Sequence, residues 1–336
     1  MKKNMACFLL LCSCTVIFAQ DIVENEPARV GQDIEYYLYA PFREDSRVVS
    51  LPARSRLNLR NNLPLLDGAT ALYPVYSAFV KAAFPENPPR GYTYTLSYGA
   101  LQADAAAEKL IIRCSQTPRA YENLINGEVD IIFCAEPSNE QIAKAAEKGI
   151  KFNMTPIGID AFVFFVNKNN RIDNITSEQV RAIYSGEITN WSSLNGNDEP
   201  IIAYQRPKNS GSQTILESVI MANDSVMEPL KENLVGGMGG MVEQVAVYKN
   251  YANAIGYSFL FFTREMVQND QIKLLSVDTV YPSKETIQTG EYPFTGPFYA
   301  ITGGDETRNM KRLIKWILSD QGQYLVEKTG YIPIKR

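Results

Sequence analysis

The sequence predicts an α/β fold, because short apolar runs that suit strands alternate with longer segments of helical periodicity. The runs at 129–133 and 162–167 are examples of such strands. Short links that carry Gly, Ser, Thr or Pro connect them, as expected where helices begin and end. Strands joined to helices in this way usually pair in parallel, so we expect a parallel sheet. At 336 residues the chain is long enough for two domains, each with its own core.

The first half of the chain repeats a unit of strand, turn and helix. A strand at 63–66 is followed by small residues at 67–71 and by a stretch at 72–83 whose large side chains recur at helical spacing. The same order continues with a strand at 109–114, a helix at 119–126 ended by Gly127, a strand at 129–133 and a helix at 141–148 ended by Gly149.

The second half continues the alternation. It is predicted to contain strands at 162–167, 200–204 and 254–259, and helices at 176–185, 215–221, 241–251 and 308–318, the last carrying on through 321–328. We interpret residues 236–240, four glycines around Met238, as a flexible hinge or turn. The segment lacks the Lys-Ser/Thr pair that follows the glycines of a P-loop.

Residues 1–20 are typical of a cleaved export signal, with two lysines followed by an apolar stretch at 5–18. The stretch is too short to span a bilayer. Two endings of the signal remain open. Cleavage near Ala19 gives a soluble protein, whereas the tetrad at 11–14 resembles a bacterial lipobox, which makes Cys14 a lipid-anchored first residue. We therefore expect an exported protein in the periplasm or on the outer face of a membrane.

The charge balance excludes some classes of partner. Removal of residues 1–20 takes away two lysines and no acid, so the net charge changes from −4 to −6. Nucleic acids and anionic membranes attract basic surfaces, so neither is an expected partner.

Cys114 and Cys134 are the cysteines that follow the signal, and each ends an apolar run. Two interpretations remain open for them. They could form a disulfide in an oxidising compartment if their strands are neighbours. Alternatively, both are small buried hydrophobic side chains.

The most informative residues are Arg206 and the run Ser210-Gly211-Ser212-Gln213-Thr214, which lie where a strand gives way to an apolar helix. A helix that begins with small hydroxyl residues and a Gly presents free backbone N–H groups and the positive end of its dipole. A nearby guanidinium completes the description of an anion pocket. The chain contains no His, so we expect this pocket to hold an oxyanion and not to transform it.

Two other helix starts carry hydroxyl groups after a strand, at Thr70 and at Ser115 with Thr117. Ser and Thr are common N-caps, so each start alone says little. In an open parallel sheet, however, such loops gather at the carboxyl ends of the strands, where ligands bind. Three such starts with one Arg therefore predict a shared anion site.

From residue 63 to the end, the chain resembles the phosphate-binding proteins of bacterial phosphate ABC transporters. The motifs that carry the resemblance occur in the same order, namely Asp67-Gly68-Ala69-Thr70, Ile188-Thr189-Asn190-Trp191, Arg206 with Ser210-Gly211-Ser212, and Ala254-Ile255-Gly256-Tyr257. The resemblance implies the type II periplasmic binding protein fold, with two α/β lobes and a ligand cleft between them. It also implies a non-catalytic protein. We expect an N-terminal arm at 21–62, a first lobe at 63–158 and 262–336, and a second lobe at 159–261.

The resemblance also implies which residues bind the ligand. Arg206, Ser210, Gly211 and Ser212 match the family's Arg and Ser-Gly-Thr, with Ser212 in place of the Thr. Thr70 and the N–H of Ala71 match the first lobe. Ser115 matches less well, because Gln116 and Thr117 stand where glycines usually follow. Glu136 is the nearest match to the acidic acceptor that selects a protonated oxyanion, although its spacing is one residue off. Lys208 stands where some members have an acid that pairs with the arginine.

These expectations lead to one main function and two alternatives. The main function is capture of phosphate, or a similar tetrahedral oxyanion, and its delivery to the permease subunits of an ABC transporter. The protein is then a monomer without cofactor or metal. A sensor or signalling protein with the same fold is a second class. A phosphatase is a third, but the chain lacks His, metal-ligand spacing and a nucleophile beside a base.

Overall fold

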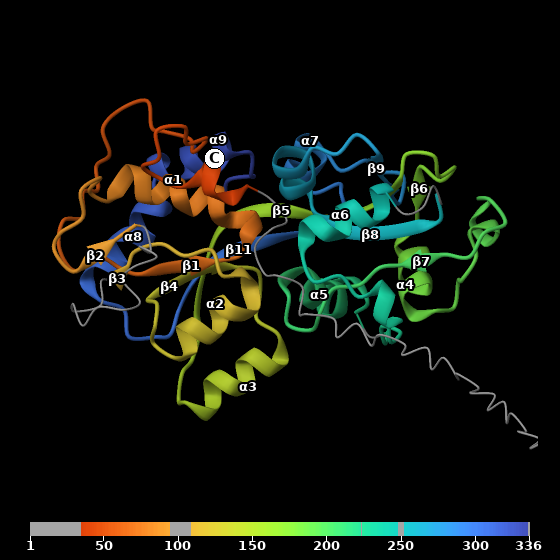
Figure 1. Ribbon diagram of the computed structural model, residues 1–336, viewed down its shortest axis with the longest axis horizontal. Helices are drawn as coiled ribbons and strands as arrows, with labels where there is room; N and C mark the ends of the chain where they lie inside the picture. The colour runs from red at the N-terminus through yellow and green to blue at the C-terminus, as the bar shows by residue number, and fades with distance from the viewer. Residues whose placement is uncertain (1–34, 95–108, 223, 248–251, 335–336) are drawn as a thin grey trace, which may run out of the picture.

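The computed structural model describes residues 35–94, 109–222, 224–247 and 252–334 (Figure 1). The predicted export signal with Cys14 and the beginning of the predicted N-terminal arm lie outside this range. A seven-stranded sheet runs through the molecule in the order β1-β4-β11-β5-β8-β7, with β9 also paired to β5. Its strands are β1 (Leu66–Gly68), β4 (Ile131–Cys134), β5 (Asn153–Asn167), β7 (Ile202–Ala203), β8 (Ala254–Phe259), β9 (Ile272–Leu274) and β11 (Thr295–Thr302).

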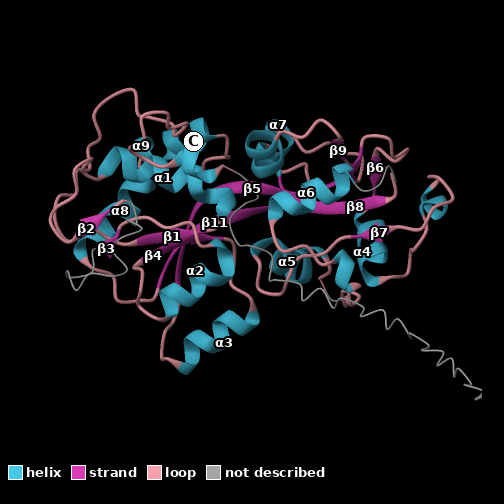
Figure 2. Cartoon of the chain, viewed as in Figure 1, coloured by secondary structure: helices cyan, strands magenta, loops and turns pink. Residues whose placement is uncertain are grey.

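Helices lie on both sides of these strands (Figure 2). In the view of Figure 2, α1 and α9 lie above β1 and β4, and α2 and α3 lie below them. The helices are α1 (Tyr73–Ala83), α2 (Gln116–Ile125), α3 (Asn139–Glu147), α4 (Ser177–Ser185), α5 (Gly211–Ile215), α6 (Met238–Val247), α7 (Lys284–Gln288), α8 (Arg308–Ile317) and α9 (Asp320–Thr329). The short strands β2 (Tyr92–Thr93) and β3 (Lys109–Leu110) pair together, as do β6 (Asn174–Ile175) and β10 (Ser276–Val277).

The sheet is mixed, so the expectation of a parallel sheet was wrong for its centre. The pairs β1–β4 and β7–β8 are parallel, whereas β11 runs antiparallel to both β4 and β5. The mixed order centres on β5, because all three strands that pair with it run antiparallel to it: β11 along its first part, and β8 and β9 along its last residues. One strand therefore passes through both halves of the molecule, and strands that arrive from either half pair with it.

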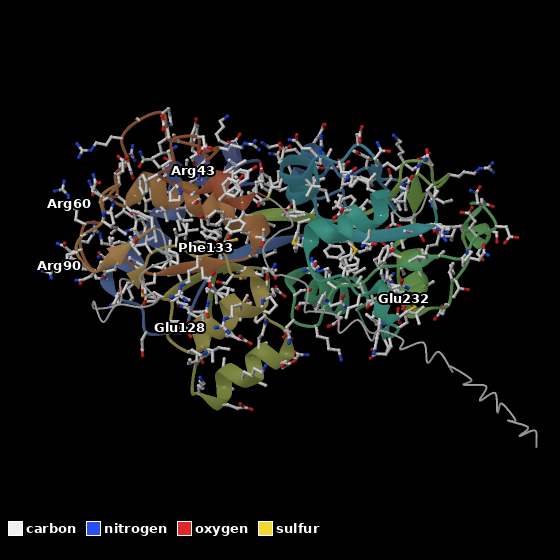
Figure 3. The ribbon with its side chains drawn as sticks, in the orientation of Figure 1. Arg43, Arg60, Arg90, Glu128, Phe133 and Glu232 are labelled. Carbon is white, nitrogen blue, oxygen red and sulfur yellow. The ribbon has the colours of Figure 1, made fainter. Side chains whose placement is uncertain are left out.

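Two large apolar clusters occupy the two halves. The α1 cluster is built on α1, α8 and α9 and includes Phe133, which lies inside that half in Figure 3, whereas Arg60 and Arg90 point outward at its edge. The β8 cluster is built on the second part of β5, α4, α6 and β8. Leu275 and Phe294 also pack in the β8 cluster, although the sequence analysis expected the chain to return to the first lobe at residue 262. The pairing of β9 with β5 keeps this segment on the β8 side.

Local signals explain most helix ends. Ser138 and Thr176 form capping boxes at the starts of α3 and α4, and Gly186 ends α4 with a positive φ of 87°. The strand predicted at 109–114 is shorter, because β3 ends at Leu110 and the chain then turns toward the end of β1. The described part of the N-terminal arm packs on the first half, where Leu57 and Leu59 are buried in the α1 cluster.

Candidate functional site

A cavity of about 330 Å³ is lined by residues from both halves of the molecule. The α1 side contributes residues 69–72, 114, 116–118 and 135–136. The β8 side contributes Arg206, residues 210–212 at the start of α5, and residues further along the same helical segment. Residues of β5 and β11 line the cavity between these groups. The helix starts that the sequence singled out at Thr70 and Ser210 therefore meet in one place.

The beginning of α5 is built as the sequence predicted. Ser210 is the N-cap, and its hydroxyl accepts a hydrogen bond from the N–H of Gln213. The first N–H groups of a helix have no acceptor within the helix, so those at the start of α5 can bind an anion. Ser212 is 2% exposed, and its hydroxyl makes no hydrogen bond with any residue that the structure describes. Buried hydroxyls are normally bonded, so this group, which lines the cavity, is available to donate a hydrogen bond to a bound ligand.

Arg206 is buried beside this helix start. Its backbone N–H is shared between Gln213 Oε1 at 3.0 Å and the Tyr257 hydroxyl at 2.9 Å. Its guanidinium donates from Nη2 to the carbonyl oxygen of Gly236 at 2.9 Å. These bonds fix the arginine to α5, β8 and the turn before α6. A guanidinium held in a dry site is a strong donor to an oxyanion.

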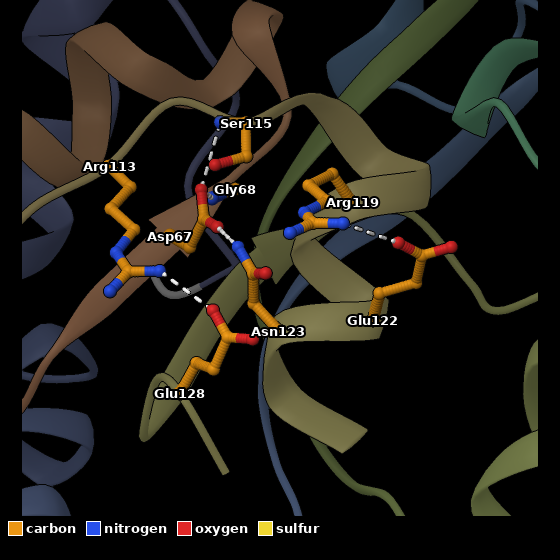
Figure 4. Close-up of polar contacts among 8 residues, drawn as sticks. All are labelled: Asp67, Gly68, Arg113, Ser115, Arg119, Glu122, Asn123 and Glu128. Carbon is orange, nitrogen blue, oxygen red and sulfur yellow. Dashed lines mark hydrogen bonds and ion pairs between the residues drawn. The ribbon is translucent and has the colours of Figure 1, made fainter. Parts of the chain in front are cut away.

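On the opposite side, Asp67 organises the loop that carries Thr70 and Ala71. Its buried carboxylate accepts from the N–H groups of Gly68 at 2.8 Å and Ser115 at 2.9 Å, and from Asn123 Nδ2 at 2.7 Å (Figure 4). Burial raises the pKa of Asp67, and these three donors oppose that rise because they stabilise the charged form. Thr70 and Ala71 both line the cavity.

Ser115 does not line the cavity, unlike the other predicted site residues. Its N–H donates to Asp67, and its hydroxyl lowers the pKa of the same carboxylate. Figure 4 shows both groups of Ser115 near Asp67. The serine therefore supports the loop that carries Thr70, and its neighbours Gln116 and Thr117 line the cavity in its place.

Glu136 lines the cavity but is exposed. Its Oε1 accepts a hydrogen bond of 2.9 Å from the hydroxyl of Tyr299 on β11. The carboxylate therefore lies at the rim and not in the buried part. Cys114 and Cys134 are free thiols and not a disulfide. Burial raises the pKa of Cys114 to about 12, so this thiol stays protonated.

A comparison with protein families decides the assignment. The family model described as the PBP superfamily domain matches residues 65–321, more than half of the chain. The chain belongs to the PBP superfamily. The match includes the loop of Thr70, the strand pair β5 and β11 and the start of α5.

The curated relatives that the chain resembles include phosphate-binding proteins named PstS. The protein from Borreliella burgdorferi is 28% identical over 218 residues, which cover 63% of this chain and 76% of the relative. The protein from Staphylococcus saprophyticus is 26% identical over 229 residues, which cover 66% of this chain and 70% of the relative.

Solved structures support the same PBP fold. A protein from Clostridium perfringens, described as a phosphate ABC transporter substrate-binding protein and solved with bound phosphate, matches with a TM-score of 0.58 and 24% identity, over 81% of this chain and 99% of its own. A phosphate transport receptor from Vibrio cholerae matches with a TM-score of 0.57 and 18% identity, over 80% of this chain and 99% of its own. The predicted two-lobed type II fold is thus confirmed.

Sequence reasoning missed several residues of this PBP cleft. Asp160 on β5 lines the cavity, and burial raises its pKa from 3.8 to about 7, although the N–H groups of Ala161 and Phe261 oppose the rise. A charged residue at the start of the apolar run 161–166 was a signal that could have identified it. Residues 236–240 were predicted as a hinge or turn, but α6 begins at Met238, which lines the cavity.

The arrangement is suited to binding an oxyanion. Hydroxyl groups, helix-start N–H groups and a buried guanidinium all line one cavity. Among the residues that the structure describes, no group of three or more acidic, Cys or His side chains could hold a metal ion. Within the same residues we find no helix with the length and apolar character needed to cross a bilayer.

Proposed function

We propose that this protein is an extracytoplasmic substrate-binding protein that captures phosphate, or a similar tetrahedral oxyanion, and delivers it to the permease of an ABC transporter. The observation that carries the proposal is the meeting of Thr70 and Ser210–Ser212 with Arg206 around one cavity. The names of the relatives, which are phosphate-binding proteins, support the same ligand. Such proteins bind and release their ligand unchanged, so we propose no catalytic residue.

In the proposed complex, the ligand's oxygens accept hydrogen bonds from both sides of the cavity. The N–H groups at the start of α5 (Ser210, Gly211 and Ser212) and the hydroxyls of its two serines provide one set of donors. Thr70 and the N–H of Ala71 provide the other set. Arg206 balances the charge. A hydrogen bond to a charged group contributes about 1.5–3 kcal/mol. Several together exceed the cost of association and allow a Kd near 1 μM, which corresponds to about −8 kcal/mol.

We also propose how the chain is divided and where it works. Most of the packing in the two apolar clusters favours a first lobe of 63–158 and 295–336 and a second lobe of 159–294, while Phe261 and Met266 pack in the α1 cluster and Ile332 packs in the β8 cluster. This division moves the boundary expected at 262, because Leu275 and Phe294 pack in the β8 cluster. We place the monomeric protein outside the cytoplasm, released near Ala19 or anchored at Cys14. Closure of two lobes on the ligand creates the form that a permease recognises.

The test is calorimetric titration of the purified protein with inorganic phosphate. Arg206→Ala is expected to weaken binding at least tenfold, because it removes the positive charge of the site. Arg206→Lys keeps the charge and loses the planar guanidinium, so its phosphate affinity should lie between those of the unsubstituted protein and Arg206→Ala. Arg171→Ala is the matched control, since Arg171 is exposed and does not line the cavity. Unchanged binding by a folded Arg206→Ala protein would refute the proposed site.

A thermal-shift series with phosphate, arsenate, sulfate, molybdate and tungstate then identifies the preferred oxyanion. A ligand that binds the native state raises the melting temperature, and at equal concentration a tighter ligand raises it more, because the stabilisation grows with the logarithm of ligand concentration over Kd. If none of these ions changes the melting temperature and calorimetry also detects no phosphate binding, the proposed function as a whole is contradicted.

A further inference from the structure

Apart from Asp160, the face of β5 and β11 that lines the cavity is apolar, and the strand register explains why. Asp160 and Phe162 are two residues apart on β5 and so point to the same face. On β11, Gly296 pairs with Asp160 and Phe298 pairs with Gly158, which places them on that face as well. Phe294, which precedes β11, also lines the cavity, and its carbonyl accepts from the N–H of Phe162 at 2.8 Å. Three phenylalanines therefore line the same cavity as Arg206 and Ser210–Ser212.

The cavity is larger than an inorganic oxyanion. A cavity needs only about 10–15 Å³ to hold one water molecule. A phosphate ion has five heavy atoms and fills a minor part of the 330 Å³. Sites of about 300 Å³ or more with mostly apolar walls and a few polar groups are typical of organic ligands.

The large volume does not arise because the α1 side and the β8 side of the cavity stand apart near the proposed oxyanion site. Ser138 and Glu140, on the α1 side, hydrogen-bond the side chain of Asn209 on the β8 side. Gly211 lies so close to the opposite wall that a Cβ atom built on it would be 3.0 Å from Thr117 Oγ1. The space remains although the two sides are already in contact.

The open space can be located at Gly296. A Cβ atom built on this glycine meets no described atom within 4 Å. Its φ lies outside the left-handed region, so the backbone accepts a larger residue there. Asp160, its partner across the strands, has a pKa raised by burial to about 7. Near pH 7 it is therefore partly neutral and repels an anionic ligand less than an ordinary carboxylate would.

From these observations we propose that the natural ligand is an organic phosphate or phosphonate, whose phosphoryl group occupies the site of Arg206 and Ser210–Ser212 and whose apolar or aromatic substituent lies on the floor formed by Phe162, Phe294, Phe298 and Gly296. The inference rests on the proposed function and narrows its ligand. The phosphoryl oxygens meet the donors already described. The substituent gains from burial against apolar side chains.

The experiment compares inorganic phosphate, phenyl phosphate and phenol by calorimetric titration of the purified protein. Phenyl phosphate carries the phosphoryl group and an aromatic ring, and phenol carries the ring alone. We expect phenyl phosphate to bind at least tenfold more tightly than inorganic phosphate, and phenol to show no binding at millimolar concentration.

A substitution at Gly296 tests whether the ring lies on the floor. Gly296→Leu fills the open space and should weaken phenyl phosphate at least tenfold, while the affinity for inorganic phosphate changes less than threefold. Gly303→Leu is the matched control, because Gly303 also has a φ outside the left-handed region, has room for a Cβ atom and does not line the cavity, so both affinities should change less than threefold.

The outcomes separate this inference from the proposed function. If inorganic phosphate binds and phenyl phosphate binds more weakly or not at all, the inference is overturned and the proposed function stands. Equal weakening of both ligands by Gly296→Leu also overturns the inference. If neither phosphate compound binds, the proposed function fails together with it.

Discussion

Ser138 Oγ donates a hydrogen bond of 2.6 Å to Asn209 Oδ1 and so joins the start of α3 to the residue before the N-cap of α5. Asn209 Nδ2 donates in turn to Glu140 Oε2 at 2.9 Å. The backbone carbonyl of Asn209 accepts from Gln141 Nε2 at 3.3 Å. Asn209 has a φ of 67°, which Asn tolerates better than most residues. The contacts join the two sides of the cavity next to Ser210, where the ligand is proposed to bind.

We expect Asn209→Gly to weaken inorganic phosphate binding about three- to tenfold, mainly through faster release. Glycine keeps the positive φ but removes the side-chain bonds to Ser138 and Glu140. Two hydrogen bonds of about 1 kcal/mol each, one partly exposed, support an effect of this size. Stopped-flow dissociation after rapid mixing with a phosphate trap measures the rate.

Asn195→Gly is the control for this change, because Asn195 also has a positive φ, of 64°, and does not line the cavity. It should leave the dissociation rate unchanged. Equal rates for Asn209→Gly and the unsubstituted protein would show that these bonds do not hold the ligand-bound form together.

The sequence was sufficient to predict the elements that carry strong local signals. The hydroxyl and Gly pattern at 210–212 predicted a helix start, and the structure places Ser210 as its N-cap. Gly127 was expected to end a helix, and it follows α2 with a positive φ of 71°. These signals act within a few residues, so a single sequence contains them.

Features that depend on contacts between distant residues were not predicted. The antiparallel course of β11 follows from its pairing with β4 and β5, whose residues are far away in the sequence. The bond that the N–H of Ser115 donates to Asp67, which lies 48 positions earlier, was not predicted either. The charge of Asp160 before an apolar run is visible in the sequence, but its place in the cavity and its raised pKa depend on β5, β11 and the helical turn of Phe261 together.

Ser212→Ala should have opposite effects on stability and binding. The Ser212 hydroxyl is buried without a hydrogen bond among the described residues, so its removal should leave the ligand-free protein equally stable or up to about 1 kcal/mol more stable. Phosphate affinity should fall about tenfold, because one donor to the ligand is lost. Thr214→Val is the matched control, since Thr214 Oγ1 is also buried without such a bond but does not line the cavity. Urea unfolding and calorimetry give both quantities, and a loss of stability without a loss of affinity would contradict the role of Ser212.

Asp67→Ala should destabilise the protein by about 3 kcal/mol or more. The substitution leaves the N–H groups of Gly68 and Ser115 and the amide of Asn123 without their acceptor in a buried place. A double-mutant cycle with Asn123→Ala should give a coupling energy of about 0.5–3 kcal/mol, as residues in one hydrogen-bond network do. Additive effects in urea unfolding would show that the Asp67–Asn123 bond contributes nothing of its own.

Asp160→Asn should change how stability depends on pH. In the native state the pKa of Asp160 is raised to about 7, while in the unfolded chain it returns to the ordinary value of 3.8. Between these values the native state holds a proton that the unfolded state has released, so the free energy of unfolding falls as the pH rises, by up to about 1.4 kcal/mol per pH unit. Asparagine does not titrate. Between pH 5 and pH 8 the free energy of unfolding of Asp160→Asn should therefore rise by about 1–2 kcal/mol relative to that of the unsubstituted protein, after allowance for partial solvent contact. Urea unfolding followed by circular dichroism at the two pH values measures this gain, with Asp305→Asn as the exposed control. Parallel pH profiles for the Asp160→Asn and unsubstituted proteins would mean that Asp160 is ionised throughout and that the floor of the cavity carries a full negative charge.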